Sequence, residues 1–414
     1  KAIVNWQSFN IGRDAAVQFI QPGAASTILN RVAGGPSDIA GRLTSNGRVY
    51  LVNPNGVLFG SSARVDVGGL VTAAGTVSDA SFLSGAPQIA TRGAVSNAGT
   101  IRTADGGSVV LAGAAVGNSG SITAPQGAIT LAAGDAVRIN LSSDGLIQAQ
   151  VTLAAAQASV ANSGILDSEG GRLALAASGV AGGAGGLVIE SGIVRAGAVR
   201  SNGGTVSLIG GEVEASGSID VSAAQGEAGS VAIFGDLQAG RVRLDAGIDA
   251  RGAMKGGMVE TSAARVQAGP KARVNTLSAS GRHGTWLIDP QDYTIGEAPG
   301  DDISGLTLST NLAQGNVTIE SVAGARSGAG DIHVNAPISW EADTTLTLTA
   351  QNSILFASSA ILDPFNPNLA APANLNASGD NAGLVLNFGA GYRLGENKIT
   401  LGGLTPRVTM NGVP

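Results

Sequence analysis

Hydrophobic residues in this chain come in short runs in which apolar and small polar positions alternate, and most runs end in glycine or asparagine. The run at 345–349 alternates strictly, which places both of its leucines on one face. Alternation over four or five residues predicts half-buried β-strands, whereas helical periodicity is almost absent. The clearest strands are expected at 108–111, 128–131, 172–175, 205–208 and 345–349.

An Asn-x-Gly turn recurs between these strands. Its asparagines are Asn97, Asn118, Asn162 and Asn202, which lie 21, 44 and 40 positions apart, or one, two and two periods near 21. A period of this length with short strands and Gly/Asn corners predicts a β-solenoid. We therefore expect an all-β chain folded as a right-handed, single-stranded parallel β-helix of roughly 20 coils.

The composition fits stacked coils. The 414 residues include 63 glycines and are 43% hydrophobic but only 3% aromatic. Stacked Val, Ile and Leu would fill a narrow core in which large aromatic side chains fit poorly. The glycines are expected at corners that need a positive φ, which Gly and Asn adopt most easily.

Charge and cysteine content exclude several classes of function. The chain has 24 Lys and Arg against 30 Asp and Glu, without a basic patch, so nucleic-acid binding is not expected. Zero cysteines exclude disulfides and thiolate metal sites, and no cofactor is indicated. No run of 18 or more apolar residues occurs, so no stable membrane span is expected.

The most informative stretch is 30–60. A strand ending near Asn30, Arg31 and Val32 runs into a Gly-Gly-Pro corner, and a strand at 49–52 runs into the tetrapeptide 53–56. In that tetrapeptide Asn53, Pro54 and Gly56 occupy the first, second and fourth positions that a type I turn prefers. The segment therefore predicts strand, sharp corner and strand, with an asparagine at each break.

The same residues carry a family resemblance. LNRV at 29–32 and GRVYLVNPNGVLFG at 47–60, with WQSFNIG at 6–12, resemble the secretion domain of two-partner-secreted exoproteins of the filamentous haemagglutinin family. The similarity is close over about the first 85 residues. GTWLIDP at 284–290 resembles a stretch found downstream of that domain in large family members.

The resemblance implies a secreted or surface-exposed adhesin stalk of a Gram-negative-type bacterium. Its implied partner is an outer-membrane transporter of the Omp85-like class; a host-cell or glycan ligand is left open. The motif residues are expected to assist transporter recognition or folding outside the cell, and they are Asn30, Arg31, Val32, Asn53, Pro54, Asn55 and Gly56. The structural alternative is that Asn30 and Asn53 are corner residues stacked in a ladder, as expected for Asn97 and Asn118.

Three sections are expected along the chain, which we interpret as an internal fragment. Residues 1–150 would form an N-terminally incomplete secretion domain, 151–284 a β-helix stalk, and 285–414 a second β-helix section with a loop near 363–376. Two alternative functions remain open. They are a polysaccharide-cleaving β-helix enzyme and the stalk of a toxin delivery protein.

The residues that could carry other chemistry have simpler explanations. Glu212 and Glu214 would share one strand face at a spacing that glycosidases use, but solvated surface charges are the simpler interpretation. His283 and His333 are expected at surface or corner positions, and glycine-rich 182–186 as a turn rather than a phosphate loop. The three tryptophans, Trp6, Trp286 and Trp340, are expected to pack at coil ends or loops. No enzyme is therefore indicated.

Overall fold

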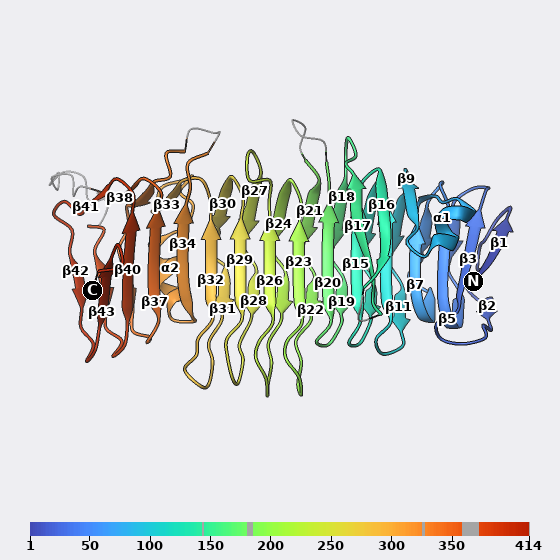
Figure 1. Cartoon of the computed structure of the whole chain (residues 1–414), viewed down its shortest axis with the longest axis horizontal. Coiled ribbons are helices and arrows are strands. Elements are labelled where there is room, and N and C mark those ends of the chain that lie inside the picture. The colour runs from blue at the N-terminus through green and yellow to red at the C-terminus, as the bar shows by residue number, and fades with distance from the viewer. Residues whose placement is uncertain (143–144, 180–184, 325–327, 358–371, 414) are drawn as a thin grey trace. The chain divides into compact units, whose positions relative to one another are not determined.

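A computed structural model describes residues 1–142, 145–179, 185–324, 328–357 and 372–413. The chain divides into two compact units, each a stack of mostly parallel β-strands (Figure 1). Unit 1 comprises residues 1–198 and 202–221, and unit 2 comprises 199–201 and 222–414. The predicted parallel β-helix is therefore confirmed.

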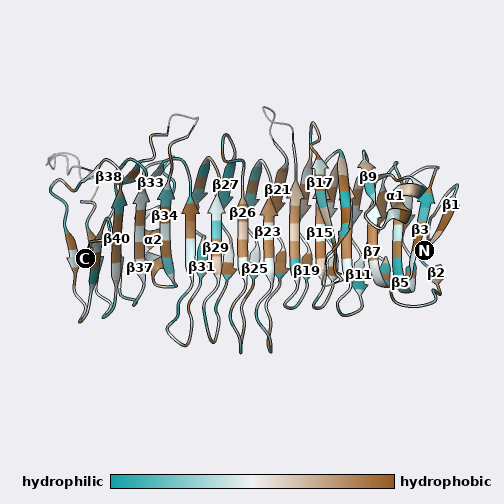
Figure 2. Cartoon of the chain, viewed as in Figure 1, coloured by the Kyte–Doolittle hydropathy of each residue, from teal (hydrophilic) through white to brown (hydrophobic). Residues whose placement is uncertain are grey.

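Each coil of unit 1 contributes one strand to each of its helical sheets. One coil runs through β10 (Ala94–Asn97), β11 (Thr100–Thr103) and β12 (Ser108–Gly113). The next coil repeats this order and pairs with it in parallel register, so Val95 lies beside Val116 and Ile101 beside Ile122. The inward side chains therefore form aliphatic columns, as expected, and hydrophobic positions recur along the strands in Figure 2.

The remaining elements of unit 1 have the following bounds: β1 (Ala2–Trp6), β2 (Ala16–Phe19), β3 (Thr27–Val32), β4 (Ser37–Ile39), β5 (Arg42–Val52), β6 (Val57–Phe59), β7 (Arg64–Ala73), β8 (Gly75–Thr76), α1 (Asp79–Ser84), β9 (Gln88–Thr91), β13 (Ala115–Asn118), β14 (Ser121–Thr123), β15 (Ala128–Ala133), β16 (Ala136–Leu141), β17 (Ile147–Leu153), β18 (Ser159–Asn162), β19 (Ile165–Asp167), β20 (Arg172–Ala177), β21 (Leu187–Glu190), β22 (Ile193–Arg195), β23 (Thr205–Ile209), β24 (Glu212–Ala215) and β25 (Ser218–Asp220).

Unit 2 has β26 (Ser230–Phe234), β27 (Arg241–Leu244), β28 (Gly247–Asp249), β29 (Met258–Ser262), β30 (Arg265–Ala268), β31 (Arg273–Asn275), β32 (Thr285–Asp289), β33 (Tyr293–Ile295), α2 (Gly305–Leu312), β34 (Asn316–Ser321), β35 (Ile332–Val334), β36 (Ile338–Trp340), β37 (Thr345–Ala350), β38 (Ser353–Phe356), β39 (Leu375–Ala377), β40 (Gly383–Phe388), β41 (Gly391–Arg393), β42 (Ile399–Leu401) and β43 (Arg407–Met410).

The uniform 21-residue repeat was wrong. Asn97 and Asn118 are register partners 21 residues apart, but Asn118 pairs directly with Asn162, 44 residues on. The interval that suggested two coils is a single coil into which the β16–β17 hairpin is inserted. Because coils differ in length, a 21-residue repeat overestimates how many the chain forms.

The hairpin covers a second hydrophobic core on the outer face of the first coils. It joins β9 and β8 in a small antiparallel sheet, and α1 lies beside it (Figure 1). Tyr50, Val71 and Val110 on the coils pack with Phe82 of α1 and Val137 of β16. Burial there raises the pKa of Tyr50 to about 12, with Arg48 opposing the shift.

Strands beneath this sheet are buried on both faces. β12 and β15 are buried at every position, whereas β20, the next strand of the same stack, alternates between buried and partly exposed positions. The sequences differ accordingly. β12 is SVVLAG and β15 is AITLAA, whereas β20 is RLALAA and places an arginine on the outer face. The antiparallel sheet itself was not predicted.

Most glycines serve close approach between coils, which corrects the expectation of positive φ. A Cβ on Gly120 would lie 2.1 Å from the carbonyl oxygen of Gly99, and one on Gly164 2.1 Å from that of Gly120. Neither glycine has a positive φ. A second column relates Gly127 to Gly107, at 1.8 Å. These columns let consecutive corners stack at the spacing of paired strands.

We expect Gly127→Ala to destabilise the chain by about 1–3 kcal/mol, because the added methyl would force the corner away from Gly107. Gly117→Ala is the matched control, since a Cβ there meets nothing within 4 Å. The measurement is the urea midpoint followed by circular dichroism. Equal midpoints for the two variants would contradict the close-approach role.

Two expectations about unit 2 need correction. Trp286 and Trp340 lie within β32 and β36 and point into the core, with 1% and 3% of their surfaces exposed, so coil-end packing was wrong for both. Their indole nitrogens donate to Thr261 Oγ1 and the Thr344 carbonyl, both at 3.1 Å. The loop expected near 363–376 lies partly outside the described residues, and its end is strand β39.

Candidate functional site

The motif asparagines at 30 and 53 are buried, and neither belongs to a ladder. Asn30 lies inside β3 and not at its end, so the predicted break at this residue was wrong. Its Oδ1 accepts from Trp6 Nε1 at 3.0 Å and its Nδ2 donates to the Tyr50 carbonyl at 3.3 Å. Asn30 thus connects the coils on either side of it, through β1 and β5.

The 53–56 turn forms as predicted. The Gly56 amide donates to the Asn53 carbonyl at 3.1 Å, and the Asn55 amide donates to Asn53 Oδ1 at 2.9 Å. Gly56 has a φ of +106°, which a residue with a side chain rarely adopts. The strand then resumes as β6, as expected.

This turn is fastened to the corner of the preceding coil. Asn53 Nδ2 donates to the Gly35 carbonyl at 2.9 Å and to Ser37 Oγ at 3.0 Å. Asn55 Nδ2 donates to the Gly34 carbonyl at 2.7 Å. The second motif therefore closes the corner that follows the first, and the two motifs act on neighbouring coils.

Arg31 connects the first motif to the outer elements. Its guanidinium forms a salt bridge with Asp79 in the first turn of α1 and donates to Asn5 Oδ1 at 3.2 Å. Ser78 caps this helix by accepting from the Ser81 amide. Asn30 thus makes its bonds within the coils, whereas its neighbour Arg31 binds α1. Val32 is buried in the core.

A separate amide ladder runs through unit 1. Asn97 Nδ2 donates to Asn118 Oδ1 at 2.8 Å, and Asn118 Nδ2 to Asn162 Oδ1 at 2.7 Å, which confirms the ladder expected for Asn97 and Asn118. Its next member is Glu190 and not Asn202, which lies in an exposed connection. The sequence signal was Glu190-Ser191-Gly192, which repeats the spacing of Asn162-Ser163-Gly164.

The other candidate residues remain structural or surface groups. Glu212 and Glu214 share the outer face of β24, next to Leu187 and Ile189 of the neighbouring strand. Trp6 ends β1 and packs against Phe9, as expected for a coil end.

Both histidines occupy the positions expected of them. His283 accepts from the Ser278 amide in a loop, and His333 is a half-exposed residue of β35. The glycine run at 182–186 lies largely outside the described residues.

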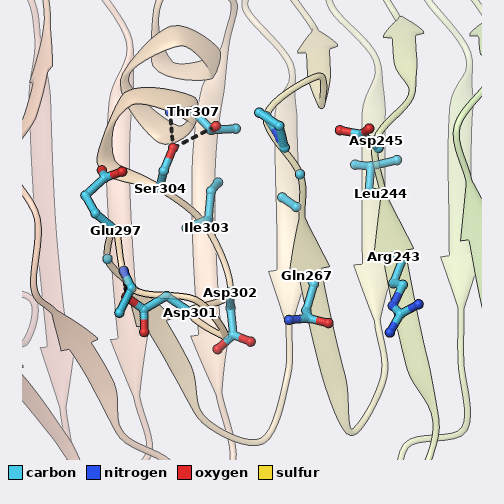
Figure 3. A pocket seen from close by; sticks show the side chains of 15 residues that line it. Arg243, Leu244, Asp245, Gln267, Glu297, Asp301, Asp302, Ile303, Ser304 and Thr307 are labelled. Atoms are coloured by element: carbon cyan, nitrogen blue, oxygen red, sulfur yellow. Dashed lines mark hydrogen bonds between the residues drawn. The ribbon is translucent and has the colours of Figure 1, made fainter.

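Unit 2 has a surface hollow of about 430 Å³ beside α2, whose lining is mixed in charge (Figure 3). Its carboxylates already bind backbone amides: Asp245 accepts from Lys271, Glu297 from Gly305, Asp301 from Ala298 and Asp302 from Thr294. Burial raises the pKa of Asp302, opposed in part by the neighbouring Arg265 guanidinium. These contacts explain the acids as turn and cap residues.

No cluster of metal-ligating side chains occurs among the described residues. Neither described helix is long and apolar enough to cross a membrane.

The family described as the TPS secretion domain matches residues 1–221, just over half of the chain. The chain belongs to this family. It therefore contains a secretion domain of the kind found in exoproteins exported by two-partner secretion. The match ends at residue 221, which is also the last residue of unit 1. The predicted boundaries at 150 and 284 stay predictions.

Two Haemophilus influenzae proteins are similar to part of this chain. Both are heme/hemopexin-binding proteins, 52% identical over 68 residues and 49% identical over 72 residues. These segments are 16% and 17% of this chain but only 8% of each relative.

A solved structure supports the fold. The HMW1 secretion domain from Haemophilus influenzae matches with a TM-score of 0.65 and 22% identity, over 96% of this chain and 92% of that one. The likeness extends beyond residue 221, so it shows a β-helix fold for nearly all of the chain.

Proposed function

We propose that this chain is the secretion-directing and stalk-forming part of a surface adhesin, and that the linked corners at Asn30 and Asn53 start its folding outside the cell. The observation that carries the proposal is the bonding of the second motif to the corner after the first. A coil that closes early has no folded neighbour on one side, so side-chain bonds that fix its corners matter most there.

Export supplies the direction of this process. A chain delivered in an extended form must complete its coils in order, because each strand pairs with the strand of the preceding coil. The Asn30 side chain donates to the Tyr50 carbonyl of the next coil, and the Asn53 side chain donates to the Gly35 carbonyl of the preceding coil. The motifs are therefore suited to fix the register between β3 and β5 before later coils form.

The adhesin part of the proposal rests on the regular outer faces of the coils. Parallel stacking repeats outward side chains along each face, as with Thr318 and Thr347 in unit 2. Repeated weak contacts on such a face add up by avidity. A polysaccharide-cleaving enzyme is less well supported, because Leu187 and Ile189 of β21, which lie beside Glu212 and Glu214, add no carboxylate to the pair.

Export is tested by placing residues 1–221 behind a cleavable secretory signal and before a small reporter. We expect reporter in the medium only when the cognate transporter is co-produced, and a version ending at residue 150 tests the predicted boundary.

The adhesin role is tested separately. Beads coated with the exported full chain should retain cultured epithelial cells better than beads coated with the reporter. Transporter-independent release would refute the export role, and equal cell retention the adhesin role.

A further inference from the structure

The amide ladder of unit 1 has a fixed direction. Asn97, Asn118 and Asn162 each donate from Nδ2 toward the following coil. The last acceptor is Glu190, whose two carboxylate oxygens lie 3.1 and 2.9 Å from Asn162 Nδ2. A carboxylate has no hydrogen to donate, so its presence at one end sets the orientation of every amide before it.

Glu190 also ends the ladder. Its register partner on β24 is Ala215, whose methyl group neither accepts nor donates. An amide at position 190 would leave its N–H groups facing that methyl, and a buried donor without a partner is destabilising. The ionised carboxylate avoids this, and it accepts a further bond from the Gly192 amide at 2.8 Å.

Burial acts against the ionised form. Glu190 is 0% exposed, and desolvation raises its pKa from 4.5 to about 7, although bonds from Asn162 and Gly192 oppose the rise. No neighbouring charge shares in the shift. The charged residues of the strands in contact with β21 lie on outward positions: Glu212 and Glu214 on β24 and Arg172 on β20, while β18 carries none.

We propose that Glu190 is a proton-sensitive end of the amide ladder, so that the coil that carries it closes with the uptake of a proton. The ladder's direction requires an acceptor at this position, whereas burial favours the neutral acid. These opposing demands make the last laddered coil of the secretion domain a pH-responsive step in its folding. The proposal concerns the folded chain and holds whether or not the motif corners guide export.

The protonation of Glu190 determines how the stability of this coil changes with pH. The carboxyl binds its proton more tightly in the folded chain than in the unfolded one, so its contribution to stability is greatest below pH 4.5. That contribution falls as the pH rises from there through about 7. Closure of this coil is therefore favoured by mildly acidic conditions.

Amide hydrogen exchange of the full chain, read on peptides that cover β18 and β21, tests the proposal between pH 5.5 and 8.5 after correction for intrinsic exchange. We expect protection of these strands to fall as the pH rises, and Glu190→Gln to remove this dependence. Glu212→Gln is the matched control, since it removes an outward carboxylate of the next strand. It should keep the wild-type profile.

Ala215→Ser provides a test that does not depend on how well Glu190→Gln folds. A hydroxyl at this position can donate to the carboxylate and stabilise its ionised form, so the proton should leave, and the protection should be lost, at a different pH from wild type. We expect the shift to lower pH. An unchanged profile in Glu190→Gln, or no shift in Ala215→Ser, would overturn the proposal.

Discussion

Replacing Asn53 or Asn30 with isoleucine is expected to cut the amount of exported protein sharply, to a small fraction of wild type. Asn53→Ile removes the bonds to Gly35, Ser37 and the Asn55 amide, and Asn30→Ile removes those to Trp6 and Tyr50. Both side chains are 0% exposed, so each change leaves buried polar groups without partners, at a cost of about 1–3 kcal/mol per group. The measurement is the full-length protein in the medium, with its cognate transporter co-produced.

Asn118→Ile is the matched control. Asn118 is 2% exposed and bonds to Asn97 and Asn162, so its loss is similar in burial and in the number of bonds broken. It lies in a ladder with coils on both sides, which later-folding neighbours can support. We expect a much smaller loss of secretion. Equal losses at all three positions would mean that the motif asparagines act only through general stability, and full secretion of both motif variants would remove their export role.

Val137→Asp is expected to destabilise the secretion domain by about 3–5 kcal/mol, because it places an unpaired charge in the outer core. Val137 is 0% exposed and packs with Tyr50, Val71, Val110 and Phe82 beneath the hairpin. The change should release the hairpin from the outer face while the inward columns of the coils persist. Urea unfolding followed by circular dichroism measures the loss.

Gln150→Asp is the control for Val137→Asp. Gln150 lies on the neighbouring strand of the hairpin, is exposed, and sits opposite Arg138. A charge there remains solvated, so the urea midpoint should stay close to wild type. If the two variants unfold at the same midpoint, the outer core does not hold the hairpin on the coils.

Local residues sufficed to predict strands and turns. Alternating runs such as 345–349 became β37, and the Asn-Pro-Asn-Gly segment formed the expected turn, in which the Asn55 amide donates to Asn53. Both features depend on contacts within a few residues, where backbone preferences and side-chain alternation dominate. The motifs at 29–32 and 47–60 likewise indicated the secretion family, which the match over residues 1–221 shows.

Only the tertiary structure showed how many residues each coil contains and which contacts the corner residues make. The sequence determined that Asn97, Asn118 and Asn162 recur, but a 44-residue interval cannot by itself distinguish two coils from one coil with a hairpin. It also determined that glycine is abundant, whereas only the stacking showed that Gly120 is needed for approach to Gly99 and not for a positive φ. Asn30 was recognised as important, yet its partners, Trp6 and Tyr50, belong to neighbouring coils. Register between coils is set by long-range strand pairing and packing, and these contacts join residues whose separation in the sequence carries no local signal.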